Sequence, residues 1–79
     1  MEITIKCFGL LEDELGASEI KIEIKEGCTQ FDLASKLETE HPQLKTIQYQ
    51  IAINMMVNDA ESTISTNDEI ALLPPFAGG

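Results

Sequence analysis

The sequence predicts an α+β fold, in which short strands form one sheet and one longer helix crosses it. Three observations support this class. Two N-terminal segments alternate between apolar and polar residues, a central segment has helical periodicity, and apolar runs separated by turn residues follow up to residue 73. The length of 79 residues predicts a single domain over residues 1–79. The expected order of elements is β-β-α-β-(β)-β, with a short strand in the bracketed place.

The N-terminal residues 2–8 alternate between apolar and polar side chains. A period of two is typical of a half-buried strand. Ile3, Ile5 and Cys7 are expected on its buried side, and Phe8 on the opposite side with the polar residues. The first strand therefore places one aromatic side chain on the outer face of the predicted sheet.

A second alternating segment, residues 19–25, carries isoleucines on one side and charged residues on the other. Between the two strands, residues 10–15 predict a short helical turn that Gly16 closes. Residues 26–27 form the turn after the second strand. The short connection between the two strands indicates that they pair antiparallel.

The longer helix is predicted to begin at Thr29, because Thr is a favourable N-cap and Asp32 follows at the spacing of a capping box. Its buried stripe consists of Leu33, Ala34 and Leu37. Pro42 ends the helix near His41, where a histidine is favourable beside the helix C-terminus.

The second half of the chain predicts a loop over residues 44–50, a strand over residues 51–54 and a final strand over residues 69–73. Ile64 is expected to anchor a short edge strand, and residues 66–69 to form a turn. A hairpin, a crossing helix and later strands, in this order and length, fit a ubiquitin-like β-grasp fold, a β-β-α-β-β roll.

The expected core lies on the apolar face of each predicted element. It consists of Ile3, Ile5, Ile20, Ile22, Ile24, Leu33, Leu37, Ile53, Ile70 and Leu72. A domain of this size buries only about 60% of the surface that its unfolded chain exposes. Function is therefore expected on the surface, at a terminus or in a partner, and not in a deep cleft.

The charge balance narrows the class of partner. Fourteen acidic residues against five lysines give a net charge of −9, which argues against binding nucleic acid and against docking on an anionic membrane. The charge suits a basic protein partner, and it suits solubility alone equally well. Cys7, Cys28 and His41 form no metal-site spacing. Two free thiols and the absence of a signal peptide predict a cytoplasmic protein.

The tail, residues 74–79, is the strongest candidate for function. It follows a predicted strand, which fixes its root, and Pro74 and Pro75 favour an extended exit. Because glycine has no Cβ, the Gly78-Gly79 backbone fits a narrow channel and the Gly79 carboxylate reaches a buried site. Adenylation would give this carboxylate a good leaving group. A sulfur donor would then convert it into a thiocarboxylate, a nucleophile that passes on its sulfur.

Residues 67–79 resemble the C-terminus of the MoaD/ThiS sulfur-carrier family in the spacing of Asp-Glu, the apolar strand, Pro-Pro and Gly-Gly. The segments Phe8-Gly9, Leu15-Gly16 and Ile53-Asn54, and the helix that opens at Thr29, resemble the same family. The proline pair favours the molybdopterin-synthase branch of this family over the thiamine branch.

The resemblance implies a division of labour between this chain and its partners. Gly79 would bear first the acyl-adenylate and then the thiocarboxylate, and the residues that enter the active site of a large subunit would be Pro74, Pro75, Phe76, Ala77 and Gly78. The large subunit would carry the catalytic residues and convert precursor Z into molybdopterin, in a complex of two large and two small subunits. An E1-like (MoeB-like) adenylyltransferase would use ATP, and a cysteine desulfurase or rhodanese-like protein would donate sulfur. The chain itself is expected to bind no cofactor and no metal.

The sequence departs from the family pattern in two places. Glu12-Asp13 stand where the family often has Arg-Glu, and Gln30 stands where it has an apolar residue. The alternative functions are sulfur donation to thiamine or to tRNA, protein modification through Gly79 joined to lysines, and a β-grasp interaction module whose Gly-Gly is incidental.

A candidate interface lies near the root of the tail. If the first and last strands are neighbours, Phe8 and Leu73 lie together on the outer face of the sheet, and Val57 joins them. A cluster of exposed apolar side chains marks an interface. We therefore predict that Phe8, Val57 and Leu73 contact the partner; the alternative is that a loop covers them.

Overall fold

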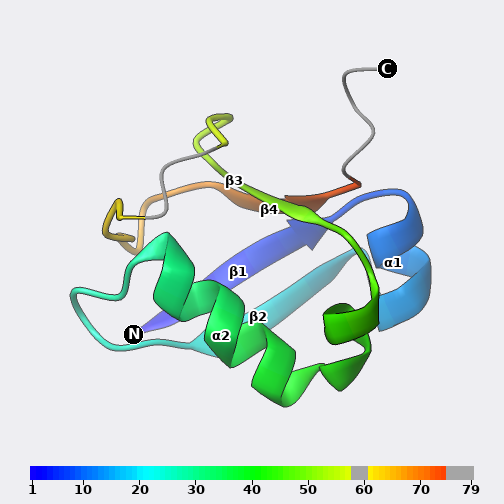
Figure 1. The fold of residues 1–79 in the computed structure, drawn as a ribbon. Helices are drawn as coiled ribbons and strands as arrows, with labels where there is room; N and C mark the ends of the chain where they lie inside the picture. The colour runs from blue at the N-terminus through cyan, green and yellow to red at the C-terminus, as the bar shows by residue number, and fades with distance from the viewer. Residues whose placement is uncertain (58–60, 75–79) are drawn as a thin grey trace.

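The computed structural model describes residues 1–57 and 61–74. Its elements are β1 (Glu2–Cys7), α1 (Leu10–Leu15), β2 (Glu19–Glu23), α2 (Gln30–Glu40), the 3-10 helix η1 (Pro42–Thr46), β3 (Gln50–Ile53) and β4 (Ile70–Leu73). In Figure 1, α2 and η1 lie along one face of the sheet, and α1 closes the end at which β1 leaves it.

The sheet has the strand order β2-β1-β4-β3. The predicted antiparallel pairing of β1 with β2 is confirmed, with Ile3 opposite Ile22. The first and last strands are also neighbours: β1 and β4 run parallel, with Cys7 opposite Leu72, while β3 pairs antiparallel with β4. A mixed sheet crossed by one helix is the ubiquitin-like β-grasp arrangement of the α+β class that the sequence predicted.

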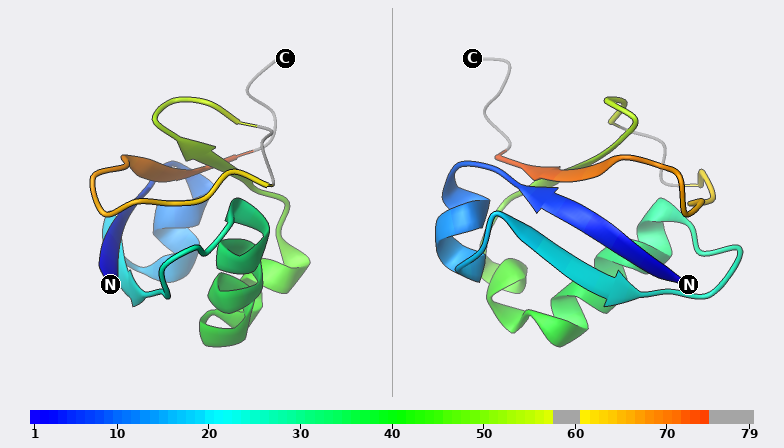
Figure 2. Two further views of the ribbon diagram at one scale, coloured as in Figure 1. Left: turned by 90° about the vertical axis from the view of Figure 1, so that its left-hand side faces the viewer. Right: turned by 180° about the vertical axis from the view of Figure 1, so that it is seen from behind.

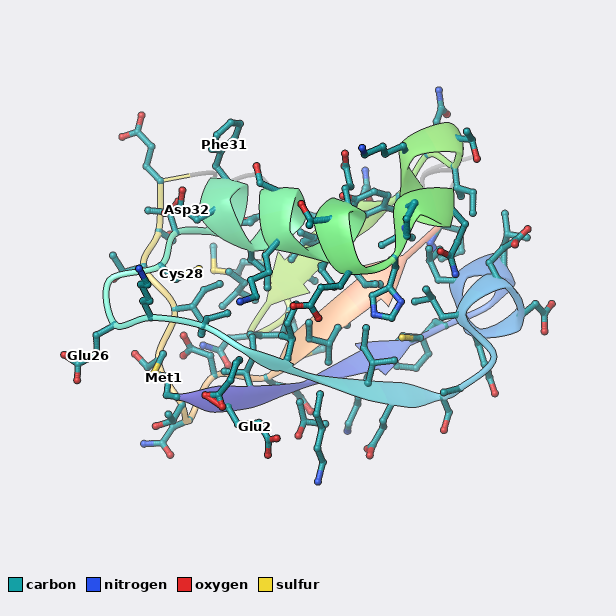
Figure 3. The ribbon with its side chains drawn as sticks, turned by 90° about the horizontal axis from the view of Figure 1, so that it is seen from below. Met1, Glu2, Glu26, Cys28, Phe31 and Asp32 are labelled. Carbon is teal, nitrogen blue, oxygen red and sulfur yellow. The ribbon has the colours of Figure 1, made fainter. Side chains whose placement is uncertain are left out.

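The start and the end of α2 confirm the predicted signals. The Asp32 N–H donates to Thr29 Oγ1 at 3.1 Å, and the Thr29 N–H donates to Asp32 Oδ2 at 3.2 Å, which completes a capping box. The helix ends at Glu40, and Pro42 opens η1. Phe31, in the first turn of α2, points away from the sheet (Figure 3) and is 67% exposed.

The core between α2 and the sheet contains most of the predicted side chains. Those that are buried are Ile3, Ile5, Ile22, Ile24, Leu33, Leu37, Ile70 and Leu72, together with Cys7. Ile20 and Ile53, which lie on the two edge strands of the sheet, are half-buried and pack against this core. The structure adds core side chains that were not predicted: Leu11, Leu44, Ile51 and Ile64.

Two expectations for the second half of the chain were wrong in part. Residues 42–46 form η1, where a loop was expected from residue 44, and the burial of Leu44 explains why this segment is ordered into a turn of helix. Ile64 is buried, but the described residues around it form a single bridge between Thr63 and Thr29 and no strand. The Ile64 N–H donates to the Cys28 carbonyl at 2.8 Å and the Gln30 N–H donates to the Ser62 carbonyl at 3.0 Å, so a single bridge replaces the expected ladder.

Both cysteines are free thiols. Cys7 is buried and Cys28 is half-buried. Burial raises the pKa of each thiol, and a nearby carboxylate, Glu12 or Asp32 respectively, adds to the effect. Neither thiol is therefore activated as a nucleophile. Over the described residues, no helix is long and apolar enough to cross a membrane.

Candidate functional site

A hollow of about 360 Å³ lies on the outer face of the sheet, opposite the core. Its lining consists of Lys6, Phe8, Ala52, Met55, Val57, Glu69, Ala71 and Leu73. Phe8 is 46% exposed, and Val57 and Leu73 are half-buried. The structure thus brings together Phe8, Val57 and Leu73, the three side chains that were predicted to form an interface. The hollow formed by all eight lining residues is called the docking hollow below.

The pairing of β1 with β4 explains why Phe8 and Leu73 are adjacent. Cys7 lies opposite Leu72 in the parallel register, and the Phe8 N–H donates to the Leu72 carbonyl at 3.2 Å. Successive side chains of a strand point to opposite faces, so burial of Cys7 and Leu72 places Phe8 and Leu73 on the outer face. Seen from behind in Figure 2 (right), β1 and β2 lie in front of α2, so no helix of residues 1–57 or 61–74 covers this outer face.

Gly9 determines how closely the root of the tail approaches β1. Its φ is +56°, and a Cβ built on it would lie 3.1 Å from Pro74 Cγ. Only glycine suits this backbone conformation and this contact. This contact of Gly9 with the root of the tail was not predicted from the sequence. The Phe8-Gly9 pair within the family resemblance was the one signal of a larger role.

A strained two-residue turn forms one wall of the docking hollow. Asn54 and Met55 both have positive φ, at 52° and 69°. The backbone groups of Ile53 and Met56 close the turn with hydrogen bonds of 2.9 and 3.0 Å. In Figures 1 and 2 this turn, which follows β3, rises from the sheet on the side away from α2. This turn was not predicted from the sequence.

The side chain of Asn54 ties this turn to the segment before β4. Its Nδ2 donates to Asp68 Oδ1 at 2.9 Å, and the Glu69 N–H donates to its Oδ1 at 2.9 Å. Asp68 Oδ2 also accepts from the Ser65 N–H at 2.8 Å. The hydrogen bonds from Ser65 and, secondarily, Asn54 lower the pKa of the Asp68 carboxyl. Two turns far apart in sequence are thereby fixed against each other.

The polar rim of the docking hollow consists of Lys6 and Glu69. Lys6 Nζ lies 3.4 Å from Glu69 Oε2, and both side chains are exposed. An exposed pair of this kind contributes little stability, so both groups are available to a partner at small cost. Over the described residues, no group of three His, Cys, Asp or Glu side chains is placed to hold a metal ion. The hollow therefore combines an apolar floor with one exposed pair of opposite charges at its rim.

A second, more open groove of about 760 Å³ runs between α2, η1 and β3. Tyr49 Oη donates to Glu38 Oε2 at 2.7 Å in its wall. Burial, and then the bond to Glu38, raise the pKa of Tyr49. Gln30 Nε2 donates to the Ile51 carbonyl at 3.1 Å, which occupies an acceptor on the free edge of β3. These contacts hold α2 against the sheet and include no reactive group.

Of the predicted tail residues, the structure describes Pro74, which is half-buried at the end of β4. The others lie outside the described residues: Pro75, Phe76, Ala77, Gly78 and Gly79. The geometry therefore places the root of the tail beside the docking hollow.

Comparison with known sequences gives a match over nearly the whole chain. Residues 5–79 match the ThiS family. The chain is 31% identical to a molybdopterin synthase sulfur carrier subunit from Dictyostelium discoideum, over 99% of this chain and 96% of that protein. A protein of the same name from Chlamydomonas reinhardtii is 25% identical, with all of both chains covered.

Solved structures share the fold at lower identity. A protein from Pyrococcus furiosus described as a molybdopterin converting factor, subunit 1, superposes with a TM-score of 0.86 at 21% identity, over 95% of this chain and 98% of that one. The small archaeal modifier protein 1 from Haloferax volcanii gives 0.80 at 21% identity, with both chains fully covered. A chain in a complex of subunits 1 and 2 of a molybdopterin-converting factor from Helicobacter pylori gives a TM-score of 0.67 at 21% identity, over 100% of this chain and 100% of that chain.

Proposed function

The chain belongs to the ThiS family, and we propose that it is the sulfur carrier subunit of a molybdopterin synthase. The observation that carries this proposal is the match over 99% of the chain to a relative of that name at 31% identity. The apolar docking hollow beside the root of a Gly-Gly tail supports it, because a carrier without catalytic side chains of its own must work through a partner.

Gly79 carries the chemistry in this proposal. Its carboxylate oxygen bonds to the α-phosphorus of ATP on an E1-like adenylyltransferase, and pyrophosphate leaves. The terminal sulfur of a cysteine persulfide on a cysteine desulfurase or rhodanese-like donor then attacks the acyl carbon, and AMP leaves. A thiol attacks the donor cysteine sulfur of the resulting acyl disulfide, which releases the thiocarboxylate and leaves a disulfide between the thiol and the donor cysteine. The resulting thiocarboxylate is the sulfur source for precursor Z. The carrier contributes a reachable carboxylate, and the other proteins contribute ATP binding, sulfur and catalysis.

The large subunit of the synthase is the proposed occupant of the docking hollow. Subunit 1 of the Helicobacter pylori factor, which has this fold, forms a complex with its subunit 2. A partner seated on Phe8, Val57 and Leu73 would lie next to Pro74 and would receive the tail, residues 74–79, in its active site. Two large and two small subunits are the proposed assembly.

The test of this function changes the end of the tail. Deleting Gly79, or adding one residue after it, should abolish thiocarboxylate formation while leaving the unfolding midpoint unchanged, because the tail lies beyond β4. Intact mass of the protein purified from cells reports the exchange of one oxygen for one sulfur. Molybdopterin synthesis by an extended variant that is not trimmed would refute the mechanism.

A second candidate function is protein modification through Gly79. The structural similarity to a small archaeal modifier protein, with a TM-score of 0.80, favours it. The two candidates share the adenylation step and differ in the product. A modifier forms isopeptide bonds to lysines of other proteins, which digestion and mass spectrometry detect as Gly-Gly remnants, whereas a dedicated carrier leaves none.

A further inference from the structure

Met55 is the most exposed large apolar side chain among the described residues, at 87%. It lines the docking hollow together with Phe8 and Leu73. Its neighbour Met56 is also exposed, at 71%, but it borders a different hollow, beside Ser62 and Thr63. The two methionines therefore have the same chemistry and similar exposure, and they differ in the surface to which they belong.

The backbone at Met55 is unfavourable for methionine. A two-residue turn with positive φ at both central residues strongly prefers glycine in the second place. Asn54 tolerates the left-handed region, but an unbranched side chain such as that of Met55 is strained there at φ 69°. With so little of its surface buried, Met55 gains almost no packing to offset this strain.

The turn is nevertheless held firmly. Asn54 bonds to Asp68 and to the Glu69 backbone, and the Asn54 N–H donates to the Glu69 carbonyl at 2.7 Å. Glu69 directly precedes β4, whose Ala71 and Leu73 line the same hollow. The backbone that carries the Met55 side chain is therefore fixed relative to the hollow before any partner binds. Such preorganisation lowers the entropic cost of binding.

We propose that Met55 is a specificity-determining contact of this chain with the large subunit of molybdopterin synthase, and that its strained turn exists to present it. The proposal rests on the proposed function, which supplies the occupant. Continuity with Phe8 and Leu73 at the root of the tail makes Met55 part of the same interface. Methionine adapts its shape to an apolar partner surface and is enriched at interfaces.

The experiment compares four variants in binding to the large subunit encoded by the same genome, measured by calorimetry, and in thermal unfolding. Met55→Gly should bind about 5- to 20-fold more weakly, as a moderate hot spot does, and should melt about 4–8 °C higher, because glycine relieves the strain. Met55→Ala should lose the same affinity without the gain in melting temperature, because alanine keeps the strain. Met55→Leu should retain affinity, and Met56→Ala should change neither quantity.

Met55→Gly is expected to weaken binding and to raise the melting temperature. A residue with only a structural role would not show this combination, because loss of its side chain would lower stability and affinity together. Wild-type affinity in Met55→Gly and Met55→Ala would overturn the inference, as would an equal loss in Met56→Ala. If the wild-type chain binds no large subunit and acquires no thiocarboxylate in cells, the proposed function fails, and the inference fails with it. Failure of the Met55 variants alone leaves the carrier function intact.

Discussion

Gly9 is the residue at which the first strand meets the root of the tail. Gly9→Ala should lower the free energy of unfolding by about 1–3 kcal/mol, because its φ of +56° suits only glycine and the new Cβ would press on Pro74. It should also reduce sulfur loading, measured as the thiocarboxylate fraction by intact mass. Gly16→Ala is the matched control, since Gly16 also has positive φ but nothing lies within 4 Å of its Cβ position. Equal sulfur loading of the two variants would show that Gly9 does not position the tail.

Phe8 and Leu73 are expected to contribute binding energy at the docking hollow. Phe8→Ala or Leu73→Ala should weaken binding to the large subunit by about 1–3 kcal/mol. Stability should fall less than for Leu33→Ala in the core, where about 2–5 kcal/mol is expected. Calorimetry and urea unfolding measure the two quantities. Unchanged affinity in both variants would remove Phe8 and Leu73 from the interface.

Gln30 departs from the family pattern because its side chain bonds to a distant part of the chain. An apolar side chain was the family expectation at this position, on the inner side of the first turn of α2. The amide instead donates to the Ile51 carbonyl on the free edge of β3. This bond could not be predicted from helical periodicity, because its acceptor lies 21 residues away.

At the scale of elements, the network of Asn54, Ser65 and Asp68 makes the hairpin after β3 sensitive to acid. The Asp68 pKa lies below its ordinary value of 3.8, so its contribution to stability is present above that pH and is lost as the pH falls through the lower, folded-state pKa. Asp68→Asn keeps an acceptor for the Ser65 N–H but does not titrate. Its stability in urea should therefore decline less steeply than that of the wild type below pH 3.8. Parallel declines would show that Asp68 does not contribute.

The elements that the sequence predicted well are those with complete local signals. β1 and β2 alternate over their full length, and α2 carries a capping box, a buried stripe and a terminating proline. The segment containing η1 has no regular periodicity, and Leu44 is its one buried residue. The residues around Ile64 indicated a short strand, which does not form. The Ile64 backbone instead bonds to the Cys28 carbonyl, in a part of the chain that is distant in sequence.

At the scale of the whole molecule, the net charge of −9 should govern how fast partners meet. We expect the association rate with a basic large subunit to fall about tenfold between low salt and about 0.5 M salt, with little change in the dissociation rate. Stopped-flow or surface-resonance kinetics measure both rates. A change confined to dissociation would indicate that the charges act within the bound interface instead.

The part of the candidate site that depends only on the order of the strands could be predicted from the sequence. Phe8 and Leu73 were placed together on the assumption that β1 and β4 are neighbours, and the parallel register bears this out. Met55 was not predicted as part of the site, because methionine gives no local signal for a turn with positive φ. The contribution of Gly9 depends on a contact with Pro74 across the fold, which no local pattern encodes.

The parallel pairing of β1 with β4 has a consequence for quality control in the cell. β4 is the last strand of the described chain, yet it lies between β1 and β3, and its Ile70 pairs with Ile5 near the N-terminus. Pairings so distant in sequence form late, because loop closure must precede them. Phe8 and Leu73 therefore meet, and Pro74 settles on Gly9, only in a molecule that has finished folding. A large subunit that recognises this surface would therefore accept only copies of the carrier that have finished folding, and misfolded copies would not bind it.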